Sequence, residues 1–247
     1  ALFLFPTSFF LAALYSETLY LAVSLTALLM IRKHRWWWAA GLIAVASATR
    51  ITGIFLVLAL IAEWATSLQW HAAKLKQQLP KIMLVSGVAS LGLLSYMAYL
   101  WWQFHDPLYF LHVQAEFGAG RSESIITYPQ VVWRYLKMLA TVRPFDWKFY
   151  AITSEFLAGV LPLLALFRWG RGLRLSYLVY GLACFILPTL TGTFSSMPRY
   201  LLVVWPVFLG LAVWSKAHRP SFILYLIFSS LLLIINTVLF IQGIWIA

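Results

Sequence analysis

Charged side chains are rare in this chain, so each one beside apolar sequence is a candidate for chemistry. Glu17 lies in the stretch Leu14-Tyr15-Ser16-Glu17-Thr18-Leu19, and a long apolar run follows it. A carboxylate in such a place is costly unless it is paired or faces a wet cavity, which makes Glu17 a candidate functional group. The simpler interpretation is a helix-end charge near a membrane interface.

Arg199 is the second candidate, in Ser195-Ser196-Met197-Pro198-Arg199-Tyr200 at the mouth of another apolar run. The planar guanidinium group binds two oxygens at once and therefore suits phosphate. Proline is favoured in the first turn of a helix, so the stretch predicts a helix start, where free N–H groups and the helix dipole attract anions. The alternative is an arginine that reaches from the membrane edge to water.

The third candidate is the dense polar stretch that begins at His105 and Asp106 and continues with His112, Gln114, Glu116 and Arg121. Ordinary loop charges are the alternative here. The spacing of His105, His112 and Glu116 matches no tight metal-ligand pattern, so the sequence predicts no metal site, and a divalent cofactor stays open. The chain has no glycine-rich phosphate loop and no nucleophile elbow.

The composition determines the fold class that must position these residues. Apolar residues make up 63% of the chain and charged residues only 10%, whereas a soluble domain is about half apolar and a quarter charged. The sequence therefore predicts an integral membrane protein: an all-α, polytopic transmembrane helical bundle that forms a single domain over residues 1–247. The apolar runs are Phe9–Ile31, Trp36–Ile61, Ile82–Trp102, Phe149–Phe167, Leu175–Leu190, Tyr200–Trp214 and Phe222–Ile244.

Lys and Arg gather in short breaks between the runs, which is typical of membrane-protein loops and argues against nucleic-acid binding despite a net charge of +11. Trp36–Ile61 fits either one span or two half-length helices. The two-helix alternative places more of the Lys and Arg on one side, and Arg50 and Gly53 fit a turn. We therefore expect about six full spans plus one short-helix hairpin.

The same model assigns sides. The basic breaks are expected to be cytoplasmic, and the first residues, the Arg50 turn, the segment 103–148 and the loop 191–198 are expected to face outward. Val131–Leu139 mixes apolar and basic positions and predicts an amphipathic helix in the outer interface.

A family resemblance begins at Phe5-Pro6-Thr7-Ser8-Phe9-Phe10-Leu11-Ala12-Ala13-Leu14-Tyr15-Ser16-Glu17-Thr18-Leu19. This stretch resembles a motif of the PIG-V mannosyltransferases of GPI-anchor assembly and their bacterial relatives, with Thr18 where the motif has Ser. Two further stretches resemble the bacterial relatives: Asp106-Pro107-Leu108-Tyr109-Phe110…Gln114, and Met197-Pro198-Arg199-Tyr200…Trp205-Pro206. The resemblance covers most of the chain.

The resemblance implies a GT-C glycosyltransferase of a bacterial plasma membrane. Such an enzyme takes a sugar, here mannose by kinship, from a polyprenyl-phosphate donor and transfers it to an acceptor hydroxyl on the outer face. Its general base is an Asp in an outer loop, which we expect upstream of Ala1. Residues 1–247 would then lack this base and be inactive alone. No cofactor is implied, and the expected partners are the lipid-linked donor and membrane lipids.

Candidate roles follow from this resemblance. The expected donor-phosphate ligands are Arg199, Arg50 and Arg121, because positive charge stabilises a departing polyprenyl phosphate. The expected acceptor- and sugar-positioning residues are Glu17, Asp106, His112 and Gln114. We expect Glu17, Asp106 and Arg199 to converge on one outward-opening cavity.

Two other functions remain open. A transporter or flippase of lipid-linked sugars would also have broken helices and a buried charge, with charges near mid-membrane in several spans. A non-catalytic scaffold subunit would lack a polar cavity.

Overall fold

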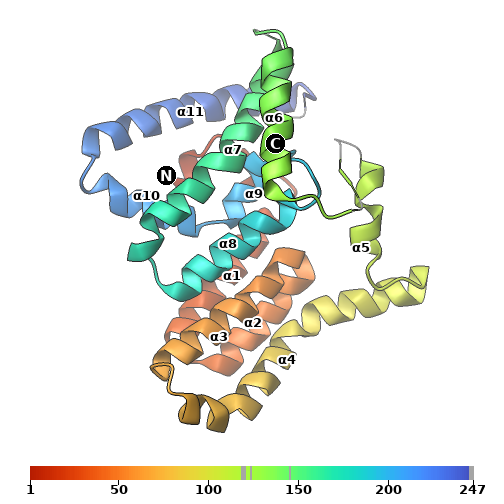
Figure 1. Cartoon of the computed structure of the whole chain (residues 1–247), viewed down its shortest axis with the longest axis vertical. Coiled ribbons are helices and arrows are strands. Elements are labelled where there is room, and N and C mark those ends of the chain that lie inside the picture. The colour runs from red at the N-terminus through yellow and green to blue at the C-terminus, as the bar shows by residue number, and fades with distance from the viewer. Residues whose placement is uncertain (118–120, 123, 145, 245–247) are drawn as a thin grey trace. The chain divides into compact units, whose positions relative to one another are not determined.

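The computed structural model describes residues 1–117, 121–122, 124–144 and 146–244, and these residues form helices and turns without a strand (Figure 1). The predicted all-α fold class is therefore confirmed. The sequence predicts a single domain over residues 1–247, and the structure divides the chain into two compact units. Unit 1 comprises Ala1–Tyr15, Val113–Leu173 and Phe185–Ala247, and unit 2 comprises Ser16–His112 and Arg174–Cys184.

Three helices among the described residues are long and apolar enough to cross a membrane: α4 (Ala72–Phe104), α7 (Trp147–Trp169) and α11 (Arg219–Ile241). A fourth span would be a broken one, in which Met197–Val203 and Pro206–Ser215 are bent by 81°. These apolar helices indicate a membrane protein. The expected count of six full spans is not confirmed.

Two of the expected spans differ from the observed helices. In the run Phe9–Ile31, the α-helix α1 begins only at Glu17 and ends at Arg32, and the residues before it form the short 3-10 helices η1 (Leu2–Leu4) and η2 (Ser8–Leu11). The run Tyr200–Trp214 is divided into α9 (Met197–Tyr200), η6 (Leu201–Val203) and α10 (Pro206–Ser215). The backbone leaves helical geometry at Val204 (φ −86°, ψ 47°). Pro206, in the first turn of α10, has no N–H with which to continue a helix across this break.

Unit 2 contains the predicted short-helix hairpin. The helices α2 (Trp36–Thr49) and α3 (Phe55–Ser67) are joined by an extended residue, Arg50, and by the 3-10 helix η3 (Ile51–Ile54). The ring of Trp36, at the start of α2, stacks on the ring of Trp64, near the end of α3, at 4.2 Å between centroids. The two helices therefore run antiparallel, and the predicted break at Arg50 is confirmed.

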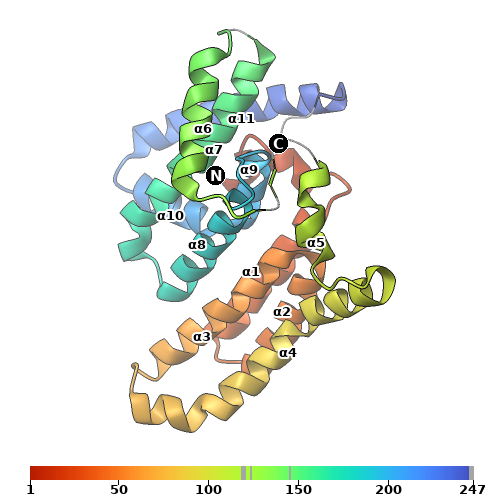
Figure 2. The same cartoon turned by 45° about the vertical axis from the view of Figure 1, so that its right-hand side comes forward.

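A glycine permits this tight return. A Cβ atom on Gly53 would lie 2.4 Å from the backbone carbon of Ala46 in α2, closer than any side chain allows. Figure 2 shows α1, α2 and α3 side by side in unit 2, with α4 alongside α2. The short helix α5 (Tyr109–His112) and the start of α8 (Leu175–Thr189) complete the unit.

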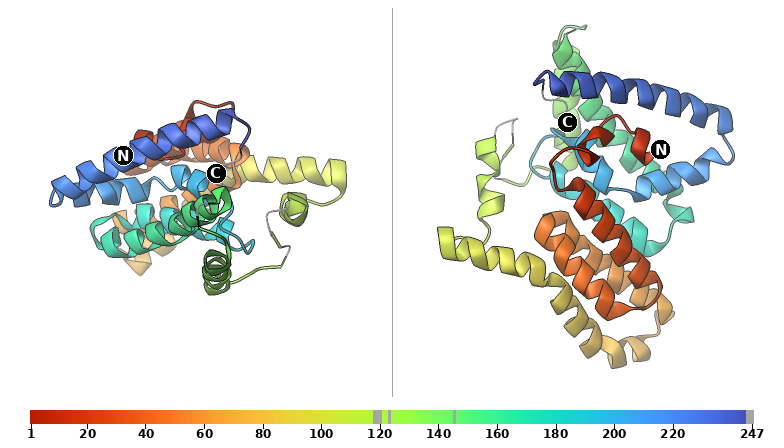
Figure 3. Two further views of the ribbon diagram at one scale, coloured as in Figure 1. Left: turned by 90° about the horizontal axis from the view of Figure 1, so that it is seen from above. Right: turned by 180° about the vertical axis from the view of Figure 1, so that it is seen from behind.

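Unit 1 is built around α7. The helix α6 (Tyr128–Thr141) lies beside it, and the N-terminal 3-10 helices lie along α11 (Figure 3). The Ser229 hydroxyl of α11 donates to the Leu4 carbonyl (2.6 Å), and the rings of Phe9 and Phe240 are 5.0 Å apart. The remaining elements of the unit are η4 (Val113–Phe117), η5 (Gly170–Gly172), the end of α8, α9, η6 and α10.

The expected amphipathic helix is present as α6. It begins with a capping box in which Gln130 Oε1 accepts the Thr127 N–H at 3.2 Å. Val131 and Tyr135 are buried, one turn apart on the face towards the protein, while Trp133 and Leu136 are exposed. Its position in an outer interface stays a prediction.

Candidate functional site

Arg199 lies against aromatic rings of the N-terminal segment in unit 1. Its guanidinium carbon is 4.8 Å from the ring centroid of Phe10 and 4.2 Å from that of Tyr15. Both distances fall within the range of cation–π attraction. In the same region the Thr7 hydroxyl donates to the Pro198 carbonyl (2.7 Å). The stretches around Phe5–Leu19 and Met197–Tyr200, far apart in sequence, thus meet through their side chains.

The expected helix start at Arg199 is only partly correct. Met197 begins α9 and Pro198 occupies its first turn, but the helix has four residues and gives way to η6 at Leu201. So short an element has no appreciable dipole, and the expected anion attraction from a helix start must be dropped. The guanidinium group itself carries the positive charge.

Arg121 contacts the residue that follows Arg199. Its Nη1 donates to Gln114 Oε1 (3.2 Å) and its Nη2 to the hydroxyl of Tyr200 (3.3 Å), the residue next to Arg199. The backbone supports this arrangement, because the Ser122 N–H donates to the Thr191 carbonyl at 2.9 Å. We define the Arg121–Arg199 cluster as six residues of unit 1: Phe10, Tyr15, Gln114, Arg121, Arg199 and Tyr200.

A carboxylate that the sequence analysis did not select supports the loop before Arg199. Glu155 of α7 accepts a hydrogen bond from the Tyr135 hydroxyl at 2.6 Å, and it also accepts hydrogen bonds from the Ser195 hydroxyl and the Ser196 N–H. The Tyr135 oxygen in turn accepts the Phe194 N–H (3.2 Å). Burial, together with the nearby Glu155 charge, raises the pKa of Tyr135, so the phenol stays protonated and donates.

The signal that could have identified Glu155 was present in the sequence. It lies within the apolar run Phe149–Phe167, where the reasoning applied to Glu17 holds equally.

Glu17 and Arg50 form an ion pair in unit 2. Glu17 Oε1 lies 2.6 Å from Arg50 Nη1, and the two side chains are 0% and 14% exposed. Glu17 is also the first residue of α1, where the helix dipole favours a negative charge. The pair explains how both charges are accommodated, although the sequence predicts separate roles for them.

Asp106 and His112 form a second pair in unit 2, after the end of α4. His112 Nδ1 lies 2.6 Å from Asp106 Oδ2, and Asp106 Oδ1 accepts the Leu108 N–H (2.9 Å). The hydrogen bond from His112 holds the pKa of Asp106 below its usual value. Both side chains are accessible, so this pair shapes the turn after α4 and remains open to a ligand.

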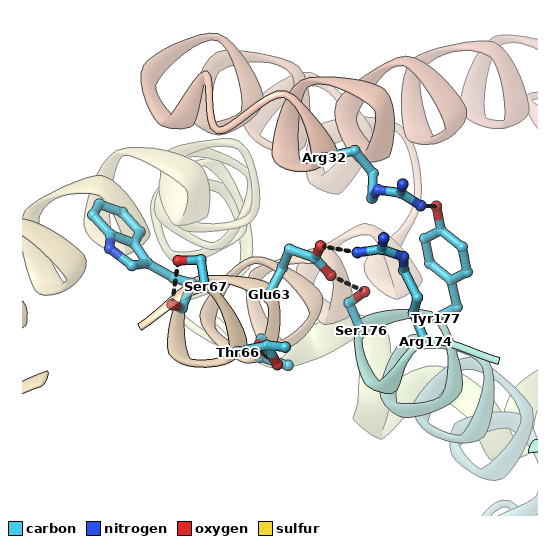
Figure 4. A network of polar contacts seen from close by, with 9 residues as sticks. Arg32, Glu63, Thr66, Ser67, Arg174, Ser176 and Tyr177 are labelled. Carbon is cyan, nitrogen blue, oxygen red and sulfur yellow. Dashed lines mark hydrogen bonds and ion pairs between the residues drawn. The ribbon is translucent and has the colours of Figure 1, made fainter. Parts of the chain in front are cut away.

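A second polar network in unit 2 connects the end of α1, helix α3 and the start of α8 (Figure 4). The carboxylate of Glu63, in α3, accepts from Arg174 Nη1 and from the Ser176 hydroxyl, both at 2.7 Å. Arg32, at the end of α1, donates to the hydroxyl of Tyr177 in α8 (3.1 Å).

This network bears on the predicted sides of the membrane. Arg32 and Arg174 lie in two different basic segments between apolar runs, and both segments are predicted to be cytoplasmic. Glu63 lies just before a third such segment. All three meet at one end of the unit. Because α1 has 16 residues and a helix rises 1.5 Å per residue, this end lies about 24 Å along α1 from Glu17.

Unit 1 also contains a cavity of about 620 Å³. One face of α7 lines it, together with Phe5, Pro6 and Thr7, which connect η1 to η2, and with residues of α10 and α11. Pro198 and Leu201, on either side of Arg199 and Tyr200, belong to its wall, as do Pro6 and Thr7.

The seven predicted site residues thus fall into three groups. Gln114, Arg121 and Arg199 belong to the cluster in unit 1. The pairs Glu17–Arg50 and Asp106–His112 belong to unit 2. Convergence of Glu17, Asp106 and Arg199 on one cavity stays a prediction. Within the described part of the chain, no group of three or more His, Cys, Asp or Glu side chains is arranged to hold a metal ion.

Comparison of the chain with protein-family models, with curated proteins and with solved structures finds no match.

Proposed function

We propose that this protein is a membrane glycosyltransferase of the GT-C type. It transfers a sugar, mannose by resemblance, from a polyprenyl-phosphate donor to an acceptor hydroxyl on the outer face of a bacterial plasma membrane. The proposal rests on the resemblance of three sequence stretches to PIG-V-like enzymes and on the geometry of the Arg121–Arg199 cluster.

The observation that carries the proposal is the contact of Arg199 with Phe10 and Tyr15. The first and third stretches of the resemblance are about 185 residues apart in sequence, yet their side chains meet. A site assembled from two motifs is expected when both serve one chemical step. Sequence proximity cannot account for their meeting.

The cluster has the chemistry that a lipid-linked phosphate requires. Two guanidinium groups, those of Arg121 and Arg199, belong to one group of side chains with the hydroxyl of Tyr200. The aromatic rings hold the Arg199 side chain in place. A guanidinium group binds phosphate through two N–H groups at once. Positive charge at this position would stabilise the polyprenyl phosphate as the glycosidic bond breaks. We assign no general base within the chain.

One alternative has support of its own. Flippases and transporters place broken helices beside their substrates, and the 81° bend between Met197–Val203 and Pro206–Ser215 is such a break. A flippase would move the lipid-linked sugar across the membrane and leave its glycosidic bond intact, which separates the two functions experimentally.

The test is sugar transfer in liposomes that contain the full-length protein and a synthetic polyprenyl-phosphomannose. Arg199→Ala is expected to lower transfer by about 2–4 kcal/mol of transition-state stabilisation. Arg199→Lys retains the charge but loses the planar fork, so it should be partly active. Arg143→Ala is the matched control, because Arg143 is an exposed arginine of the same unit.

The outcomes separate the hypotheses. If liposomes that contain the wild-type protein translocate the donor without cleaving it, the protein is a flippase and not a transferase. Full activity in a folded Arg199→Ala variant would remove Arg199 from the mechanism.

A further inference from the structure

Three basic segments of unit 2, far apart in sequence, meet around the ring of Trp64. The ring of Trp36, at the start of α2, stacks on Trp64 at 4.2 Å between centroids. Lys81 Nζ, in the third turn of α4, lies 5.9 Å from the centroid of the same ring, within the range of cation–π attraction. Glu63, the residue before Trp64, accepts a hydrogen bond from Arg174 Nη1 (2.7 Å). The basic residues after α1, in the first turns of α4 and before α8 therefore share one end of the unit.

The Lys and Arg side chains of these three segments are all exposed. We call them the basic end of unit 2: Arg32, Lys33, Arg35, Lys74, Lys76, Lys81 and Arg174.

Carboxylates do not balance this charge. Unit 2 lies wholly within the described residues, and it contains Glu17, Glu63 and Asp106. Glu17 pairs with Arg50 in the hairpin turn, and Asp106 follows the far end of α4. Glu63 is buried and already paired. The basic end thus presents a large excess of positive charge to its surroundings.

Exposed tryptophans lie in the same segments. Trp37, Trp38 and Trp70 are 50%, 70% and 58% exposed. Exposed Trp side chains are typical of the head-group level of a membrane, where one part of the ring is in an apolar environment and the N–H is wet.

The length of α4 fits this level. Its 33 residues extend about 50 Å, whereas the hydrocarbon core of a bilayer is about 30 Å thick. The first turns of α4, which carry Lys74 and Lys76, therefore extend beyond the hydrocarbon. Pro80 lies inside the helix, and Figure 2 shows α4 bent near its start. Such a bend allows the basic turns to follow the membrane surface.

We propose that the basic end of unit 2 binds the head groups of anionic phospholipids such as phosphatidylglycerol. A cluster of Lys and Arg beside a membrane-spanning helix attracts anionic lipids, and the exposed tryptophans hold the cluster at the depth of their phosphates. The exposed rings favour a lipid over a soluble polyanion, which would need only the charges. This binding does not depend on sugar transfer.

Local fluorescence quenching tests the proposal with the full-length protein in a neutral detergent. In a Cys184→Ala background, a fluorophore is attached through Gln77→Cys, an exposed position beside Lys76. Nitroxide-labelled phosphatidylglycerol should quench it at a much lower concentration than nitroxide-labelled phosphatidylcholine. The preference should decrease in high salt, because salt screens exposed charges.

Substitutions locate the binding surface. Lys74→Gln with Lys76→Gln should weaken the binding of phosphatidylglycerol by about fivefold for each charge removed. Lys33→Gln with Arg35→Gln should have a similar effect at the same fluorophore, because the segments after α1 and at the start of α4 share one surface.

The matched control is Arg143→Gln with Lys148→Gln, which removes two exposed basic side chains of unit 1 and should leave the quenching unchanged. Equal quenching by the two lipids, or equal losses in the control and in the Lys74 and Lys76 variant, would overturn the proposal. Displacement of the lipid by an equal concentration of polyglutamate would also overturn it, in favour of a soluble acidic partner. Selective binding by a protein that transfers no sugar would support the lipid surface and contradict only the transferase.

Discussion

The guanidinium of Arg50 lies 2.6 Å from the carboxylate of Glu17, which is 33 residues earlier in the sequence and fully buried. The contact joins the start of α1 to the turn of the α2–α3 hairpin. Both residues were candidates for substrate binding, and their pairing gives them a structural role that can be measured.

Replacing one member of this pair should destabilise the protein more than replacing both. Glu17→Gln or Arg50→Gln alone leaves one buried charge without its partner, at a cost of about 3–5 kcal/mol. The double substitution of Glu17→Gln with Arg50→Gln should recover much of that loss. Thermal unfolding in detergent, monitored for all four combinations, gives the coupling free energy.

A purely catalytic role would give the opposite pattern. Single variants with wild-type stability and no sugar transfer would show that the pair is maintained for the substrate and contributes little to the fold.

The two ends of unit 2 should lie on opposite sides of the membrane. The Glu17–Arg50 contact places the start of α1 and the hairpin turn on the same side, expected to be the outer one. In a Cys184→Ala background, Leu14→Cys should react with an impermeant thiol reagent added to intact cells. Lys76→Cys should react only after the cells are opened. Both positions are exposed.

The wild-type protein is the control, since its Cys184 is fully buried and should not react. Labelling at position 76 and not at 14 in intact cells would invert the assigned orientation.

Glu155 and Tyr135 should act on Arg199 through the loop that precedes it. Glu155→Gln and Tyr135→Phe remove contacts to residues 193–196, so amide hydrogen exchange in that loop should become faster. Sugar transfer should fall through kcat, because the phosphate ligand is less well positioned. Thr141→Val is the control, since the Thr141 hydroxyl bonds only carbonyls of its own helix α6.

Unchanged exchange in the loop of both variants would contradict this positioning role, whatever their activity.

The turn after α4 should lose support in acid. The His112 hydrogen bond lowers the pKa of Asp106 from 3.8. A carboxyl whose pKa is lower in the folded protein than in the unfolded chain stabilises the fold above pH 3.8, and that contribution disappears as the pH falls through the lowered value. His112→Ala should therefore move the pKa of Asp106 up towards 3.8.

Carbon-13 NMR of labelled aspartate carboxyl groups measures this shift. His105→Ala is the control, because His105 contacts the ring of Trp101. An Asp106 pKa that is the same in the His112→Ala variant and in the wild type would show that another group lowers it.

The sequence by itself determined the features that depend on local composition and period. The apolar content predicted an all-α membrane protein, and the charge and glycine at Arg50 and Gly53 predicted the hairpin that α2 and α3 form. Val131–Leu139 predicted the amphipathic helix α6. Each of these features depends on residues that are neighbours along the chain.

The tertiary structure decided which side chains meet. The pairing of Glu17 with Arg50, the contact of Arg199 with Phe10 and Tyr15, and the support of the 193–196 loop by Glu155 each join residues 33 or more positions apart. An apolar run also does not reveal whether it is one straight helix. The 81° bend lies between Val203 and Pro206, and a proline permits a break whose angle its neighbours set. Likewise, the cavity beside α7 forms only where residues 5–7, α10 and α11 meet one face of that helix.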